Sequence, residues 1–215
     1  MTEPCNLTPE DVRALVGDAD GILEVSDDGR VTIWNADGSQ AEMSGNGTRI
    51  AARWLSRRTG AEVVTVRVGA REVVARMLDG DDVEQDLGAF EVGEQEEVGG
   101  IRLVPVSVGN PHAVVVGEPG DLPEIGPLLE THPRFPDRTN VQVVRVDGPG
   151  EVTARVWERG VGETSASGTS AVAVAAATHG EGEVLVHFPG GDLRVRLERG
   201  RAHVTGPATE LVDRA

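Results

Sequence analysis

Two matching serine-glycine segments constrain this chain more than any other feature of its sequence. Ser44 begins the segment SGNG and Ser167 begins the segment SGTS, 123 residues later, and each stands in front of a stretch with helical character. A polar residue precedes each serine by nine positions, Asn35 in the first case and Glu158 in the second. A duplicated half-unit explains this spacing.

The start of a helix presents backbone N–H groups without an intrahelical partner and a partial positive charge. Glycines let that backbone approach a ligand closely, so two such turns suit the carboxylate or phosphate of one small anionic ligand. Serine is also among the most frequent N-cap residues, so each segment alone can be a simple helix cap. The repetition of the pattern favours a functional interpretation.

The remaining pattern predicts an α+β chain. Strands are expected around a turn at 27–30, in 61–77, from 101 onward, around a turn at 148–150, and in three final runs. Helices are expected at 45–58, with Ile50, Trp54 and Leu55 on its buried face, at 121–133 and at 168–179. The acidic, glycine-rich segment 79–100 is interpreted as a domain junction. Strands and helices do not alternate regularly, so a doubly wound parallel sheet is not expected.

Composition excludes several classes of function. The formal net charge of −16 argues against nucleic acid or an anionic membrane surface as partner. No apolar run approaches the ~20 residues needed to cross a bilayer, and no signal peptide is apparent, so a cytoplasmic protein is expected.

The chemistry-bearing residues narrow the choice further. The chain has no lysine, which excludes a pyridoxal phosphate Schiff base and a P-loop. Its single cysteine, Cys5, excludes an intrachain disulfide, and its five histidines lack metal-ligand spacing, so no metal is expected.

Six collinear motifs from about residue 20 to the C-terminus resemble those of the diaminopimelate epimerase family. They read NADGSQAEMSGNGTR, VGNPHAVV, HPRFPDRTNV, VWERGVGETSASGTSA, FPGG and VTGPA. The resemblance implies two pseudo-symmetric α+β halves, each a mixed sheet around one main helix, with the active site in the cleft between them. We place these halves at 1–89 and 90–203, with 204–215 returning toward the first half.

The family resemblance also implies an activity: cofactor-independent interconversion of LL- and meso-diaminopimelate in lysine biosynthesis. One group removes the α-proton and a second returns it from the opposite face. By motif, the acid–base positions are Ser44 and Ser167, and His112 and Glu158 tune them. Substrate is bound by nine residues: Asn35, Gly45, Asn46, Asn110, Asn140, Glu158, Arg159, Gly168 and Thr169. The implied partners are a small amino acid and, by analogy alone, a second copy of the chain in a homodimer.

Two departures from the family pattern stand out. Both acid–base positions are cysteine in the family, and an alcohol is a far weaker acid than a thiol of pKa ~8.5. The family also opens with a segment resembling His-Gly-Leu-Gly-Asn-Asp-Phe, and no such segment is found here.

These departures leave alternatives open. The chain can be a slow diaminopimelate epimerase, a non-catalytic homologue that binds an amino acid or stabilises a partner, or a racemase or isomerase of another amino acid. Serines introduced by engineering, and a start codon upstream of Met1, are further explanations.

Overall fold

The computed structural model describes residues 6–41 and 43–209, so Cys5 and the last six residues lie outside the described part. The chain forms two compact units, one of residues 1–85 with 206–215 and one of residues 86–205. Strands β6 (Asp82–Ala89) and β16 (Arg201–Pro207) carry the chain across these boundaries. The boundaries expected from sequence, after residues 89 and 203, stay a prediction. No described helix is long and apolar enough to span a membrane.

The first unit combines a three-stranded antiparallel sheet, β1-β2-β3, with an antiparallel pair, β4 and β5, and two helices. Its elements before β6 are α1 (Pro9–Leu15), β1 (Gly21–Val25), β2 (Val31–Asn35), β3 (Gln40–Ala41), α2 (Gly45–Thr59), β4 (Val63–Val68) and β5 (Arg71–Met77).

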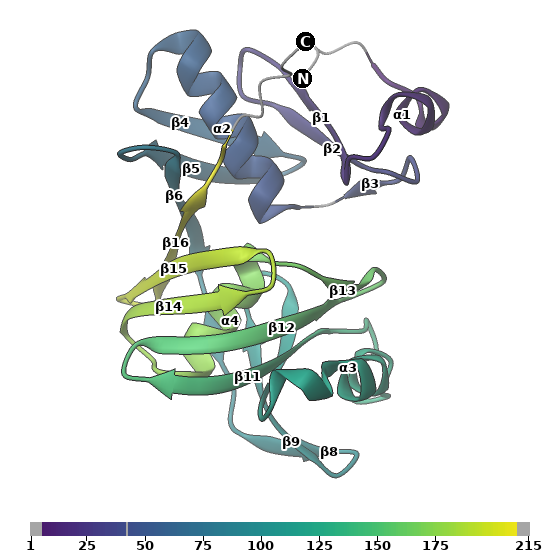
Figure 1. Ribbon diagram of the computed structural model, residues 1–215, viewed down its shortest axis with the longest axis vertical. Coiled ribbons are helices and arrows are strands. Elements are labelled where there is room, and N and C mark those ends of the chain that lie inside the picture. The colour runs from purple at the N-terminus through teal and green to yellow at the C-terminus, as the bar shows by residue number, and fades with distance from the viewer. Residues whose placement is uncertain (1–5, 42, 210–215) are drawn as a thin grey trace. The chain divides into compact units, whose positions relative to one another are not determined.

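Helix α2 packs its small-residue face into the core of this unit (Figure 1). Ala51, Ala52 and Leu55 are almost fully buried, with the three-to-four-residue spacing of one helical face. The expectation that Ile50 belongs to this face is wrong, because its side chain is 41% exposed. Trp54 is half-buried and lies under the guanidinium of Arg58, 4.7 Å from its ring centroid.

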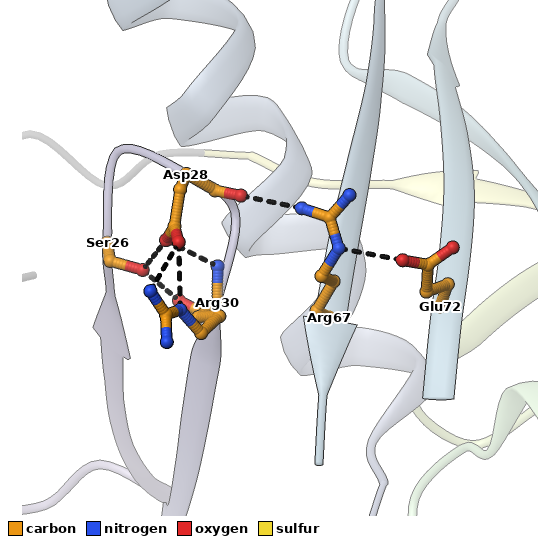
Figure 2. A network of polar contacts seen from close by, with 5 residues as sticks. All are labelled: Ser26, Asp28, Arg30, Arg67 and Glu72. Carbon is orange, nitrogen blue, oxygen red and sulfur yellow. Dashed lines mark hydrogen bonds and ion pairs between the residues drawn. The ribbon is translucent and has the colours of Figure 1, made fainter. Parts of the chain in front are cut away.

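A polar network joins the β1–β2 turn to β4 (Figure 2). Asp28 accepts hydrogen bonds from Ser26 Oγ at 2.5 Å and from Arg30 Nε at 2.8 Å, which close the turn. Arg67 of β4 donates to the backbone oxygen of Asp28 at 2.8 Å and pairs with Glu72 of β5 at 2.7 Å. Gly29 is the turn residue that packs against the backbone of β4. Its φ is +86°, and a Cβ there would stand 2.3 Å from the Thr65 carbonyl oxygen. The turn therefore requires glycine.

The second unit is a mixed sheet with two helices and begins within β6. Its elements up to β16 are β7 (Glu91–Val92), β8 (Glu96–Val98), β9 (Ile101–Ser107), β10 (Pro111–Val116), the 3₁₀ turn η1 (Pro119–Asp121), α3 (Leu122–Glu130), β11 (Asn140–Gly148), β12 (Glu151–Glu158), β13 (Gly162–Thr164), α4 (Gly168–Thr178), β14 (Gly182–Phe188) and β15 (Gly191–Glu198).

Strands β10 and β11 are parallel and buried on both faces. Ala113, Val115, Val141 and Val143 belong to the core cluster under α3. The alternate residues point to the other face, toward α4, and include His112, which is in register with Asn140. This alternation places the polar residues of the two strands beside the start of α4.

Helix α4 is buried along nearly its whole length, from Gly168 to Ala176 except Thr169. Its Ala and Val side chains belong to the main core cluster of the second unit. Figure 1 shows strands of this unit around the helix. A helix enclosed in this way needs no polar face, which explains its unbroken run of Ala and Val at 171–177.

Two local features were not expected from the sequence. The segment 79–100, interpreted as a domain junction, contains the unit boundary between Gln85 and Asp86, and it also forms β6, β7 and β8, on which Val83, Gln85 and Val98 are buried. Helix α1 was not expected. It begins at a capping box in which Thr8 Oγ1 accepts from the Asp11 N–H at 3.2 Å, and Asp11 accepts in return from the Thr8 N–H at 2.9 Å.

Candidate functional site

The start of α2 is a capped helix N-terminus. Ser44 has extended backbone angles, and its Oγ accepts from the Gly47 N–H at 3.0 Å. Helix geometry leaves the N–H groups of Gly45 and Asn46 without an intrahelical acceptor, so they are donors for an anion. The Ser44 hydroxyl is half-buried and serves as the cap.

A buried arginine stands behind this turn and was not expected from the sequence. Arg49 is 3% exposed and donates to Asn46 Oδ1 and, at 3.4 Å, to Gln85 Oε1. Burial lowers the pKa of Arg49 to about 10, so it stays charged at neutral pH. Because Arg49 holds the oxygen of the Asn46 amide, the exposed NH₂ group of Asn46 is the end presented to a ligand.

Asn35 lies at the end of β2, in the same unit as Ser44. Its Nδ2 donates to Ser39 Oγ at 2.9 Å, and its backbone N–H donates to the Ser39 carbonyl at 2.8 Å. These bonds fix the loop that leads toward Ser44.

The start of α4 differs from that of α2 in one chemical respect. Ser167 occupies the N-cap position with similar backbone angles, but its hydroxyl makes no capping bond to the helix backbone. Its side chain lies close enough to the Glu158 carboxyl group to lower the pKa of that group. Gly168 is buried and Thr169 half-buried in the first turn.

The glycine pair of the FPGG motif supports the segment before Ser167. The Gly190 N–H donates to the Ser165 carbonyl at 2.8 Å, and a Cβ on Gly190 would stand 2.8 Å from Ser165 Oγ. The close approach explains why glycine stands at this place in the motif.

Glu158 ends β12 and turns toward the loop and strand that follow it. Its Oε1 accepts from Thr164 Oγ1 at 2.7 Å. Burial raises the pKa of Glu158, and the hydrogen bond from Thr164 and the nearby Ser167 hydroxyl oppose that rise. The result is a carboxyl group of raised basicity in contact with the Ser167 hydroxyl, an arrangement suited to accepting a proton.

Asn140 clamps the backbone beside Glu158. It is 6% exposed, its Oδ1 accepts from the Arg159 N–H at 3.0 Å, and its Nδ2 donates to the Pro111 carbonyl at 2.9 Å. The Arg159 guanidinium donates to the Asp137 carbonyl at 3.2 Å. Asn140 therefore positions Arg159 through its backbone.

A second brace of the same loop was missed by sequence reasoning. Glu130, at the end of α3 and 5% exposed, accepts from Trp157 Nε1 at 2.8 Å and from the Gly160 N–H at 2.6 Å. It also pairs with Arg138 at 2.7 Å. No sequence pattern predicts this role, because the two residues that donate to Glu130, Trp157 and Gly160, are 27 and 30 residues away along the chain.

His112 is 1% exposed and lies between two amides. Its Nε2 is 3.1 Å from Asn110 Oδ1, and its Nδ1 is 3.0 Å from Gln142 Nε2. Burial lowers the pKa of His112 to about 3, so the ring is neutral at physiological pH. A neutral buried imidazole orients its neighbours and does not itself collect protons from solvent.

The structure thus brings the expected residues of the second unit into pairwise contact: Glu158 with Ser167, Asn140 with Arg159, and Asn110 with His112. In the first unit, Ser44, Gly45 and Asn46 form one helix start. Each helix start offers N–H donors for a carboxylate, and the second adds a carboxyl group in contact with a hydroxyl.

Comparison with known proteins agrees with these motifs. The sequence profile described as diaminopimelate epimerase matches residues 104–210. The diaminopimelate epimerase of Synechococcus sp. (strain JA-2-3B'a(2-13)) is 37% identical over 258 residues, which cover 98% of this chain and 89% of that protein. That of Desulforudis audaxviator (strain MP104C) is 40% identical over 232 residues, covering 91% and 83% of the two chains.

Solved structures share the fold. A predicted epimerase from Pseudomonas aeruginosa superposes with a TM-score of 0.70 at 18% identity, covering 96% of this chain and 88% of that one. A hydroxyproline epimerase from Agrobacterium vitis superposes with a TM-score of 0.60 at 21% identity, covering 83% and 67%. On the strength of the sequence relatives, the chain belongs to the diaminopimelate epimerase family.

Proposed function

We propose that the chain is a slow, cofactor-independent amino-acid isomerase that acts on diaminopimelate. The observation that carries the proposal is the contact between the Ser167 hydroxyl and the Glu158 carboxyl group at the start of α4. It supplies a route for a proton at one of the family's two acid–base positions. Family membership supplies the substrate and, with it, a place in lysine biosynthesis in the cytoplasm.

The proposed reaction moves one proton in each half. Ser167 Oγ takes the α-proton of the substrate while its own proton passes to the Glu158 carboxylate. The Ser44 hydroxyl then gives its proton to the opposite face of the same carbon, and the resulting alkoxide is stabilised by the Gly47 N–H and the helix dipole. Ser167 ends this step as a hydroxyl that carries the former α-proton, so the cycle closes when Glu158 releases its proton to water and the Ser44 alkoxide takes one from water.

In this proposal, hydrogen-bond donors at the two helix starts bind the ligand. The first-turn N–H groups of Gly45, Asn46, Gly168 and Thr169 stabilise the substrate carboxylate and the negative charge that develops beside it. The remaining contacts come from Asn35, Asn110, Asn140, Glu158 and Arg159, and His112 acts through Asn110. Asn140 contributes through the Arg159 backbone, since both ends of its amide already have protein partners.

Serine chemistry explains why the reaction is slow. A thiol at a helix N-terminus ionises at or below neutral pH, whereas an alcohol remains protonated there. Ser167 is assisted by Glu158, whereas the matching position nine residues before Ser44 is Asn35, whose amide cannot accept a proton as a carboxylate does. Return of the proton from the Ser44 side is therefore the slower half of the reaction. No pyridoxal phosphate can assist, because the chain has no lysine to hold it.

An exchange assay tests the proposal. The purified chain is incubated with LL- or meso-diaminopimelate in deuterated water, and loss of the α-proton signal is followed by NMR. We expect slow exchange that disappears in Ser167→Ala and persists in Ser107→Ala, a matched change at an exposed serine of β9. Exchange that is equal in both variants, or is found only with other amino acids in a parallel panel, would contradict the assignment.

A second candidate is a non-catalytic homologue that binds an amino acid or stabilises a partner. The observation that favours it is the capping bond of Ser44, which needs only a helix and no substrate. It predicts thermal stabilisation by diaminopimelate without any exchange of the α-proton.

A further inference from the structure

The second unit contains a chain of buried polar side chains that runs from α4 to Asn110. Gln142 of β11 is fully buried, and its Nε2 is 2.9 Å from Ser170 Oγ and 3.0 Å from His112 Nδ1. His112 Nε2 is in turn 3.1 Å from Asn110 Oδ1. Ser170 is also fully buried, while Asn110 is half-buried at the end of the chain of contacts.

With the Gln142 amide oriented as in the structure, which leaves its Oε1 without a hydrogen-bond partner among the described residues, counting protons gives the direction of hydrogen bonding along these contacts. The NH₂ group of Gln142 has two hydrogens, one for Ser170 Oγ and one for His112 Nδ1. A neutral imidazole that accepts at Nδ1 carries its one proton on Nε2. His112 therefore donates to Asn110 Oδ1, and the NH₂ group of Asn110 is the end left to face a ligand.

Reversing one amide would reverse the whole chain. If the oxygen of Gln142 faced His112, the ring proton would move to Nδ1 and Nε2 would accept from the Asn110 NH₂ group. Asn110 would then present an oxygen, which repels a carboxylate and attracts an ammonium group. Gln142, which touches no ligand position itself, thus decides which charge Asn110 favours.

We propose that Gln142 is a positioning residue that holds His112 in the Nε2–H form, so that Asn110 presents its NH₂ group to a carboxylate of the ligand. The role of Gln142 rests on the contacts described above. Only the identity of the ligand, diaminopimelate, rests on the proposed function.

The first test determines which ring nitrogen of His112 carries the proton, and it needs no ligand. Long-range ¹H–¹⁵N spectra of the full chain distinguish a protonated from an unprotonated ring nitrogen. We expect His112 to show a protonated Nε2 and an unprotonated Nδ1, unchanged from pH 8 to pH 5. A protonated Nδ1, or a ring that titrates near pH 6.5, would overturn the proposal.

The second test removes the Gln142 donor. Gln142→Met keeps similar length but cannot donate, and we expect a substantial Nδ1–H population to appear at His112. Ser170→Ala is the matched control, because it disturbs the same buried place while leaving the bond from Gln142 to His112 intact. A His112 spectrum that is unchanged in Gln142→Met, or changed equally in both variants, would overturn the role.

The third measurement links the tautomer to binding. The dissociation constant of meso-diaminopimelate is expected to rise roughly tenfold in Gln142→Met, the effect of losing one hydrogen bond to a charged group, and less than threefold in Ser170→Ala. Equal affinities in the two variants would contradict the role assigned to Asn110. Failure of the proposed function would appear separately, as absence of proton exchange with an intact His112 spectrum.

Discussion

The two serines at the helix starts have the same backbone setting and different chemical partners. Ser44 Oγ accepts from the Gly47 N–H at 3.0 Å, whereas Ser167 makes no side-chain capping bond and lies near the Glu158 carboxyl group, whose pKa it lowers. The position of Asn35, nine residues before Ser44, matches that of Glu158, but an amide cannot accept a proton as a carboxylate does. At the residue scale, the two halves of the proposed reaction are therefore unequal.

The carboxylate of Glu158 gives the proposed exchange a pH dependence. Burial raises the pKa of Glu158, so its proton-accepting form appears only above the pH at which an exposed glutamate ionises. Exchange is expected to increase as pH rises through this raised pKa. Glu158→Gln should lower the exchange rate at pH 7 by at least about tenfold and abolish the increase of the rate with pH. Glu97→Gln, at an exposed position, should keep both the exchange rate and its increase with pH.

Burial of His112 predicts a loss of stability in acid. Its folded-state pKa is about 3, whereas the unfolded side chain titrates near 6.5. Between these values the unfolded state binds a proton that the folded state does not, so stability falls as pH decreases, by about 1.4 kcal/mol per pH unit from this group.

Urea denaturation from pH 7 to pH 4 measures this component. His112→Gln should lower the free energy of unfolding at pH 7 and flatten its acid dependence relative to the unmodified chain. His203→Gln, a half-buried strand position, is the matched control and should keep the full acid slope. Parallel acid slopes in the unmodified chain and His112→Gln would contradict the account.

At the scale of helices and strands, a few close contacts between elements position the residues of the candidate site. The β1–β2 turn reaches β4 through the Arg67 N–H, which donates to the Gly29 carbonyl at 2.7 Å, and through Arg67 Nη1, which donates to the Asp28 carbonyl. Figure 2 shows how Arg67 connects this turn to Glu72 of β5. In the second unit, α3 comes so close to β12 that a Cβ at Gly126 would stand 2.8 Å from Trp157 Cγ. These approaches fix the strands that lead into the two helix starts.

The Gly29 approach can be tested against a matched turn. Gly29→Ala combines a positive φ with a Cβ 2.3 Å from the Thr65 carbonyl oxygen, so we expect it to destabilise the chain by more than ~2 kcal/mol. Gly69→Ala has a φ of +57° but nothing within 4 Å, so it should cost only ~1 kcal/mol. Thermal unfolding of both variants separates the two effects, and equal losses would show that the contact with β4 is unimportant.

Sequence periodicity and turn residues predict where the helices and strands lie, but they do not predict which residues of different elements contact one another. The helices at 45–59 and 168–178 follow their serine starts, and the hairpin around 27–30 forms as expected. Ile50 is exposed because small residues, Ala51 and Ala52, form the buried face of α2. The roles of Arg49, Glu130 and Gln142 could not be predicted, because their partners lie on other elements and become neighbours only through tertiary packing.

At the scale of the whole molecule, the chain has the fold and sequence of its family, with serine at both positions that the motif resemblance assigns to acid–base chemistry. Relatives 37–40% identical cover 91–98% of it. The N–H groups at the two helix starts, the braces of Asn140 and Glu130, and the buried pair of His112 and Gln142 all support a ligand-binding arrangement. In the proposed function, serine at both of these positions limits the rate of proton transfer but leaves these contacts in place.

The most direct measurement compares the unmodified chain with the double variant Ser44→Cys, Ser167→Cys. Both are assayed for α-proton exchange and for interconversion of LL- and meso-diaminopimelate in deuterated water. Because a thiol at a helix start ionises far more readily than an alcohol, the double variant should exceed the unmodified chain by at least about 100-fold. A double variant that binds diaminopimelate but turns it over no faster than the unmodified chain would contradict the claim that serine chemistry is what limits this protein.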